Sequence, residues 1–190
     1  ECHLAFVFYS PHFSSEIQSM IETIHENLRP QTLIGRMGEG VIGEQQEIED
    51  HPGLVLCGMN STGMHVMPFI LTPKTDGESP SLEGWPVALD SPAQPHTFFL
   101  FADPFSTPID ELFSLLDQHA PESSAIGGIA CGGMDVEECR LVLNREIIGS
   151  GVVGVAVRGG VEIRTVVSQG CQPIGERFVV TKVDRNIIQE

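Results

Sequence analysis

The amino-acid sequence predicts a mixed α/β fold made of two β-α-β-β-β repeats. The stretch AFVFYSPHF at residues 5–13 returns as TFFLFADPF at residues 97–105, an offset of 92 positions. The same offset superposes the apolar stripes of two amphipathic helices and carries Leu-Ile-Gly at 33–35 onto Ala-Ile-Gly at 125–127. A period of about 90 is longer than the ~20–50 residues of a solenoid repeat. We therefore expect two copies related by a pseudo-two-fold axis.

The first copy, at about residues 4–73, begins with a strand and a helix. Residues 4–9 are almost wholly apolar, as in a strand covered on both faces. Ser15 and Gln18 have the spacing of a capping box, and Pro30 ends the helix that follows. The expected buried stripe is Ile17, Met20, Ile21, Ile24 and Leu28.

The rest of the first copy is predicted to be strand and loop. Residues 32–37 form the second strand, and a glycine-rich loop occupies 38–43. Residues 53–59 and 64–71 then form a hairpin around the turn signal Asn-Ser-Thr-Gly. The Pro-, Ser- and Gly-rich residues 74–95 are a linker.

The second copy, at about residues 96–183, repeats this order. Thr107 caps a helix with Pro108 at its first position, and Pro121 closes the helix. The expected buried stripe is Ile109, Leu112, Phe113 and Leu116.

Strands fill the remainder of the second copy. They are predicted at 97–102, 124–130, 151–157, 161–167 and 177–183, with an additional hairpin at 140–148 that the first copy lacks. Each helix has one apolar stripe and each first strand is apolar on both faces, so we expect mixed sheets with helices on their outer faces. Two packed sheets and one continuous sheet both satisfy this pattern.

Charge and composition exclude several classes of function. The chain has 10 Lys+Arg and 26 Asp+Glu, a net charge of -16, which disfavours nucleic acid and anionic membranes as partners. No apolar run reaches the ~18–20 residues of a membrane span. Five scattered cysteines without a Cys-x-x-Cys pair indicate free thiols in a reducing cytoplasm. No His-x-x-x-His spacing occurs and no cluster of metal-ligating residues stands out, so no metal site is expected.

The candidate ligand-binding residues lie on loops that follow strands. Gly38–Gly43 matches Gly-x-Gly-x-x-Gly, but no apolar helix follows it, so we expect no dinucleotide cofactor. Its backbone N–H groups could still bind a small ligand. His12 and Asp103 follow the two first strands, where a ligand site and ordinary turn chemistry are equally good explanations. The full set is Ser10, His12, Gly38, Glu39, Gly40, Asp103, Cys131, Gly132, Gln169 and Cys171.

Several stretches together resemble the N-terminal FIST domain family. They lie at 5–13, 33–43, 101–105, 127–130, 150–156 and 166–175, and the last, VVSQGCQPIG, is the most specific. The resemblance covers essentially all of residues 1–190. At Cys131 and the acidic residues 135–139 the chain departs from the small and polar residues usual in the family.

The resemblance implies an intracellular sensory domain that binds a small metabolite, with amino acids as candidates, and signals to neighbouring domains. The implied partners are a C-terminal FIST domain following this chain and a signalling output domain. We expect a binding function rather than an enzyme. The alternatives are an enzyme with Cys171 as its nucleophile and an acidic scaffold for protein partners.

Overall fold

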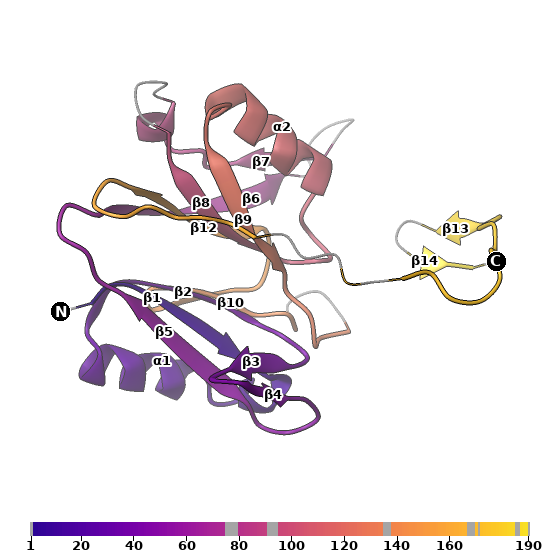
Figure 1. Cartoon of the computed structure of the whole chain (residues 1–190), viewed down its shortest axis with the longest axis horizontal. Helices are drawn as coiled ribbons and strands as arrows, with labels where there is room; N and C mark the ends of the chain where they lie inside the picture. Colours follow the sequence, from indigo (N-terminus) through magenta and orange to yellow (C-terminus); the bar gives the residue numbers. More distant parts are fainter. Residues whose placement is uncertain are drawn as a thin grey trace.

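Two five-stranded mixed sheets lie face to face, and each carries one helix on its outer surface (Figure 1). The computed structural model describes residues 2–74, 80–90, 95–134, 138–166, 170, 172–184 and 187–189. The arrangement confirms the predicted mixed α/β class with mixed sheets and outer helices. The two-fold relation between the two copies stays a prediction.

The first sheet has the strand order β11-β10-β2-β1-β5. Its central strands β1 and β2 are parallel and are joined by α1, while β5 runs antiparallel to β1 and β10 antiparallel to β2. The elements are β1 (Cys2–Tyr9), α1 (Ile17–Asn27), β2 (Pro30–Met37), β5 (Leu54–Met59), β10 (Leu141–Leu143) and β11 (Glu146–Ile148).

The second sheet has the strand order β7-β6-β12-β8-β9. Here β8 and β9 are parallel and are joined by α2, while β12 runs antiparallel to both β8 and β6. The elements are β6 (His65–Lys74), β7 (Ser81–Glu83), β8 (Thr97–Ala102), α2 (Ile109–His119), β9 (Ser124–Ile129) and β12 (Val152–Arg158).

Short elements complete the described chain. Two 3-10 turns follow β1 and β7, and two separate hairpins lie outside the large sheets. They are η1 (Pro11–Phe13), η2 (Val87–Leu89), the hairpin β3 (Val41–Gly43) with β4 (Gln46–Ile48), and the hairpin β13 (Val183–Asp184) with β14 (Ile187–Ile188). No described helix is both long and apolar enough to cross a membrane.

The strand exchange between the halves corrects two predictions. The expected hairpin at 53–71 is wrong, because β5 pairs with β1 while β6 crosses to the other sheet and pairs with β12. The hairpin at 140–148 is real but is not an addition to the second copy, since β3–β4 stands at the corresponding place after β2. Each half therefore contributes strands to the sheet of the other.

Hydrogen bonds hold the exchanged hairpin in place. At its turn, Asn144 adopts a positive φ of 55°, and its Oδ1 accepts a hydrogen bond from the Leu33 amide at 3.1 Å. Its own amide donates to the Leu33 carbonyl at 2.7 Å. The hydroxyl of Tyr9 donates to the Arg140 carbonyl at 2.8 Å. Hydrogen bonds on either side of β10 thus join the hairpin to β1 and β2 of the first sheet.

Helix α1 follows the predicted stripe. Ile17, Met20, Ile21 and Ile24 are all buried, and each such side chain stabilises the fold by about 1.5–3 kcal/mol. The predicted capping box does not form, because the N-cap is Glu16 and makes no side-chain capping bond.

Helix α2 is covered less completely. Its N-cap is Pro108, and the hydroxyl of Thr107 donates instead to the Gly151 carbonyl at 2.9 Å. Leu112 is buried, but Phe113 is 57% exposed, so its predicted burial is wrong.

The repeated Ile-Gly pairs have a common packing reason. A Cβ atom built on Gly35 would overlap the Val7 carbonyl oxygen, and one built on Gly127 would overlap the Leu100 carbonyl oxygen. In both sheets the second strand lies so close to the first that only glycine fits.

The last predicted strands are not formed. β12 has β6 and β8 as its neighbours, so the expected strand at 161–167 does not pair with it, and the described residues 161–166 are irregular. Within 177–183 only Val183 is in a strand. This end of the chain extends away from the two sheets (Figure 1).

Candidate functional site

Four aromatic rings close the seam between the sheets. Phe6 of β1 packs on Phe99 of β8 with ring centroids 4.9 Å apart, and Phe8 packs on Phe101 at 5.5 Å, both edge to face. Such pairs add about 0.5–1.5 kcal/mol to the burial of the rings. The two sheets therefore meet through rigid aromatic contacts.

A cleft of about 380 Å³ opens beside these rings. Its volume falls within the range of small-molecule sites, about 300–1,000 Å³. Its walls come from both sheets and are almost wholly apolar. The lining residues are Phe6, Phe8, Arg36, Cys57, Phe99, Phe101, Ile126 and Gly127.

Arg36 supplies the positive charge of this seam cleft. It extends from β2 toward the end of β9, where its Nη1 donates to the Ile129 carbonyl at 3.0 Å and the Met37 carbonyl at 3.3 Å. The same nitrogen lies 3.9 Å from the Cys131 sulfur. None of the ion pairs among the described residues involves Arg36. A half-buried guanidinium without a carboxylate partner favours an anion as the missing partner.

Sequence reasoning missed Arg36. It is the single charged residue of the otherwise apolar stretch 32–37, which the sequence predicts to be a strand. A lone charge in a strand buried on both faces is the signal that could have found it, since burying an unpaired charge is costly.

Several predicted site residues come together at the ends of the strands. Ser10 is buried after β1, where its Oγ accepts the Gly53 amide at 3.0 Å and lies 3.2 Å from His12 Nδ1. His12 itself is exposed. The position after β1 therefore combines a structural serine with an accessible imidazole.

The loops after β2 and β9 touch each other. The Glu39 amide donates to the Cys131 sulfur at 3.4 Å, and the Cys131 amide donates to the Met37 carbonyl at 3.4 Å. Gly132 has a φ of 97°, and a Cβ built there would lie 2.7 Å from Pro11 Cγ. The loops after β1, β2 and β9 thus form one group, which we name the strand-end cluster: Ser10, His12, Glu39, Cys131 and Gly132.

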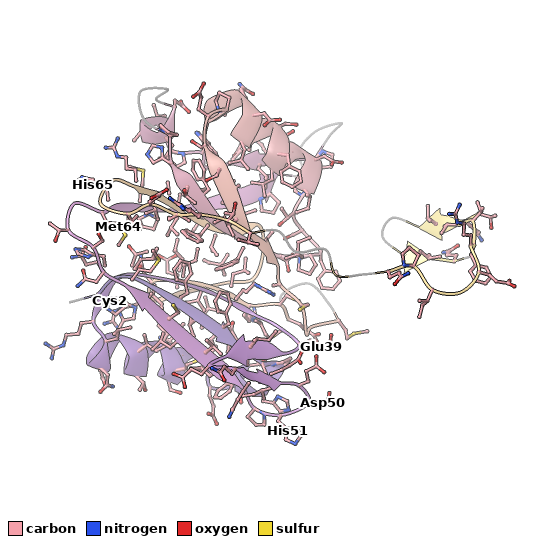
Figure 2. The ribbon with its side chains drawn as sticks, viewed as in Figure 1. Cys2, Glu39, Asp50, His51, Met64 and His65 are labelled. Carbon is pink, nitrogen blue, oxygen red and sulfur yellow. The ribbon has the colours of Figure 1, made fainter. Side chains whose placement is uncertain are left out.

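Two glycines of the predicted loop differ in their surroundings. Gly38 is buried, and its amide donates to the Tyr9 carbonyl at 2.9 Å. Gly40 is exposed and lies against β4, where a Cβ would be 3.1 Å from the Ile48 carbonyl. Glu39 between them is exposed and lies at the end of the two-sheet body opposite Cys2 and Met64 (Figure 2). The Gly38 amide is therefore already engaged, while the Glu39 side chain is free to meet a ligand.

Asp103 is fully buried in its own turn. Its Oδ2 accepts the amides of Phe105 at 3.1 Å and Ser106 at 2.8 Å, while its Oδ1 has no hydrogen-bond partner among the described residues. These bonds are the turn chemistry that the sequence left as an equal alternative to ligand binding.

The cysteines divide into buried and accessible groups. Cys131 and Cys57 are exposed, whereas Cys2 and Cys139 are buried, and all four are free thiols. Burial raises the pKa of the Cys139 thiol, which disfavours its reactive thiolate. Gln169 and Cys171, the remaining predicted site residues, lie outside the described residues.

The fold and the cleft define the class of protein: a mixed α/β domain of two face-packed sheets with an apolar, cation-bearing cleft at their seam. Comparison with known proteins gives the family. The FIST N domain model matches residues 3–190, so the chain belongs to the FIST N family, a family of sensory domains in signal transduction. This confirms the resemblance seen in the sequence.

Two mycobacterial relatives align with nearly the whole chain. This chain is 29% identical over 187 residues to the uncharacterized protein Rv0628c of Mycobacterium tuberculosis. It is also 29% identical over 189 residues to the uncharacterized protein Mb0898c of Mycobacterium bovis. Each match covers 98% of this chain and 47% of the relative, so the chain spans about half the length of these relatives.

Proposed function

We propose that this domain senses a small carboxylic acid with an apolar body, which binds in the seam cleft with its carboxylate on Arg36. The observation that carries the proposal is the half-buried Arg36 guanidinium, which has no ion-pair partner among the described residues and lies in a phenylalanine-lined cleft. A carboxylate fits a guanidinium because two parallel N–H donors can meet its two oxygens.

The donor geometry of Arg36 supports this role. Its Nη1 is held by two carbonyl groups, at 3.0 Å and 3.3 Å, which fix the direction of the guanidinium plane. The other nitrogens, Nε and Nη2, lie beside the Gly128 backbone, where a Cβ would be 3.9 Å from each. The absence of a side chain on Gly128 leaves room for an anion to approach them.

The cleft walls set the rest of the ligand. The rings of Phe8 and Phe99 are only partly buried, so an apolar body can cover them. An amino acid would also need a partner for its ammonium group. The exposed carboxylate of Glu39 is a candidate, because the Glu39 backbone and Arg36 both contact the Cys131 sulfur.

Signalling would follow from the position of the cleft. Its walls belong to both sheets, so a bound ligand contacts β1 and β2 on one side and β8 and β9 on the other. A ligand that binds one arrangement of the sheets better than another shifts the population toward it. We propose that this shift is passed to a C-terminal FIST domain and to an output domain within a longer protein.

The role is proposed as non-catalytic and cytoplasmic. The four described cysteines are free thiols, which supports a reducing compartment. The excess of 26 acidic over 10 basic residues supports small molecules and proteins as partners in preference to nucleic acids or anionic membranes. Catalysis by Cys171 remains the alternative, and loss of turnover in Cys171→Ser with binding retained would favour it.

Titration calorimetry with matched ligands tests the proposal. The panel contains 3-phenylpropionate, its alcohol 3-phenylpropanol, and the amino acids phenylalanine and leucine. We expect the carboxylates to bind and the alcohol to bind at least tenfold more weakly, because it lacks the charge-assisted hydrogen bonds to Arg36.

The variants identify the binding group. Arg36→Gln should weaken carboxylate binding by about 10–100-fold, since hydrogen bonds to charged groups contribute about 1.5–3 kcal/mol. Arg145→Gln is the matched control, because Arg145 is exposed at the turn between β10 and β11. Equal affinity of wild type and Arg36→Gln for every carboxylate would contradict the proposal.

A further inference from the structure

Among the described residues, no strand pairs with the outer edge of β9. In the first sheet, β2 lies between β1 and β10 and most of its residues are buried. In the second sheet, β9 ends the strand order, with β8 as its one described neighbour. Four of the six residues of β9 are exposed. Apart from the Ile129 carbonyl, which accepts a hydrogen bond from Arg36, the outward row of its backbone N–H and C=O groups is therefore open to pairing.

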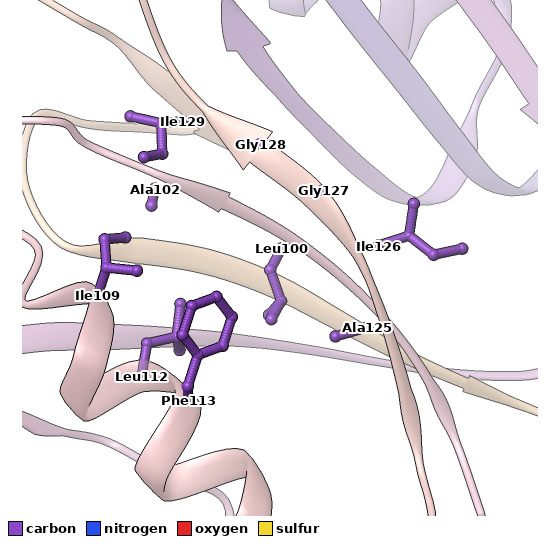
Figure 3. A pocket seen from close by; sticks show the side chains of 10 residues that line it. All are labelled: Leu100, Ala102, Ile109, Leu112, Phe113, Ala125, Ile126, Gly127, Gly128 and Ile129. Atoms are coloured by element: carbon purple, nitrogen blue, oxygen red, sulfur yellow. The ribbon is translucent and has the colours of Figure 1, made fainter. Parts of the chain in front are cut away.

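An apolar groove of about 280 Å³ follows this edge between β9 and α2. Figure 3 shows Ile109, Leu112 and Phe113 extending from the helix toward the strand, and Ile126 pointing to the opposite face of β9. Phe113 is 57% exposed and Ile129 is 47% exposed. Apolar side chains of both α2 and β9 are therefore left exposed along the groove.

The sequence of β9 offers none of the usual protection of a free edge. Natural edge strands carry charged residues or proline that block pairing with other chains. The strand Ser-Ala-Ile-Gly-Gly-Ile at 124–129 contains neither. An uncharged, glycine-rich edge beside an apolar groove is suited to receive another strand.

A second group of exposed apolar side chains lies near the C-terminal end of the same chain. Phe178 is 88% exposed, Val179 83%, Val180 50% and Val183 59%. These residues belong to Arg-Phe-Val-Val-Thr-Lys-Val at 177–183, which has the β-branched and aromatic composition of a strand. Contiguous apolar exposure of this kind marks a contact surface.

We infer that residues 177–183 leave the extended position that they have in this structure, add to the free edge of β9 as an antiparallel strand and fill the groove over α2. Val183 would then exchange its pairing with Ile188 for a pairing with β9. The segment would occupy the place that β10 takes on β2 in the first sheet. A strand there is covered on both faces, which fits the two apolar faces of the segment, Phe178 with Val180 and Val179 with Val183.

The chain is long enough to make this connection. Val161 and Ile163 share a surface pocket with Ser123 and Ser124, so the chain leaving β12 already passes the beginning of β9. The intervening residues 164–176 can span about 45 Å when extended. A six-residue strand is about 20 Å long. The connection can therefore run the length of β9 and return antiparallel to it.

Charge favours this segment over a second copy of the protein. Arg177 and Lys182 flank the apolar core of the segment, and the first turn of α2 carries Asp110 and Glu111. Two whole chains would bring together a net charge of -16 on each.

The β3–β4 hairpin is a poorer candidate. Val41 of this hairpin is only 4% exposed, and a Cβ built on Gly43 would lie 2.8 Å from Val55 of β5. The hairpin is thus already packed against the first sheet.

Hydrogen exchange measured by mass spectrometry on this chain tests the inference. We expect peptides covering 124–129 to be protected in the wild type and to exchange at least about tenfold faster in Phe178→Asp/Val180→Asp. Val166→Asp is the matched control, because Val166 is 91% exposed and lies upstream of the segment. It should leave the protection unchanged. Equal exchange in all three proteins would overturn the inference.

Two further measurements distinguish other sources of a strand. Trypsin should cleave after Arg177 and Lys182 faster in the double variant than in the wild type, and equal rates would contradict docking. Protection of β9 should not depend on protein concentration. If it disappears on dilution, a second copy supplies the strand and the inference is wrong.

Discussion

The hydroxyl of Tyr9 should control the alkaline stability of the fold. Tyr9 is fully buried, and its hydroxyl donates to the Arg140 carbonyl at 2.8 Å, which joins β1 to the chain just before β10. Burial raises the pKa of Tyr9 well above its usual value near 10, although the nearby Arg140 opposes this shift. The folded protein therefore holds the phenolic proton at pH values where the unfolded chain releases it.

The sign and size of the effect follow from proton linkage. Below pH 10 both states keep the proton, and the stabilising contribution is fully present. As the pH rises above 10 only the unfolded state loses its proton, so the free energy of unfolding falls. Between pH 10 and pH 11 the loss is about 1 kcal/mol, and it approaches about 1.4 kcal/mol for each further unit until the folded-state pKa is reached.

The Tyr9→Phe variant isolates this contribution. At pH 7 it should unfold more easily by about 1–3 kcal/mol, since the Arg140 carbonyl loses its donor. Between pH 10 and 11 it should lose about 1 kcal/mol less stability than the wild type. Urea unfolding followed by fluorescence of Trp85, the single tryptophan, measures both differences.

Tyr9 is also the only tyrosine, so absorbance at 295 nm reports its ionisation directly. We expect the tyrosinate signal to appear together with unfolding. A titration midpoint near pH 10 in protein whose Trp85 fluorescence remains native would refute the reasoning.

Three further outcomes are expected from the packing. Gly127→Ala should destabilise the fold by at least about 1–3 kcal/mol in urea unfolding, whereas Gly128→Ala, with its nearest neighbour at 3.9 Å, should not. Burial lowers the pKa of His96, so stability should fall as the pH drops below about 6.5 and His96→Gln should reduce that fall. Asn144→Ala should cost about 1–3 kcal/mol by thermal unfolding, while Asn144→Asp should retain most of the stability.

The local signals of the sequence predict the strand–helix–strand units but not the strand exchange. The order of strands and helices in 4–37 and 97–129 is predicted correctly because apolar runs and helical stripes are local patterns, although the helix caps and the burial of Phe113 are not. The sequence wrongly predicts that β5 and β6 pair with each other as a hairpin. Two apolar runs on either side of the turn residues Asn60–Gly63 have the same local pattern whether the second strand pairs with the first or crosses to another sheet. The choice depends on β1 and β12, which pair with them from far along the chain.

The candidate site was predicted in part. Sequence reasoning placed Ser10, His12, Glu39 and Cys131 after strands, and the structure brings their loops together because β1, β2 and β9 end near one another. It could not find the seam cleft. That cleft depends on which aromatic rings face one another across two sheets, and no local pattern encodes this.

Arg36 is the residue that we propose binds a carboxylate in the seam cleft. The most direct measurement is a titration of 15N-labelled protein with 3-phenylpropionate, following the side-chain Nε–H resonance of Arg36 assigned with the Arg36→Gln variant. We predict a saturable shift of this resonance, with a dissociation constant equal to that from calorimetry. An unchanged Arg36 resonance at saturating ligand, with shifts confined to other parts of the protein, would contradict the account.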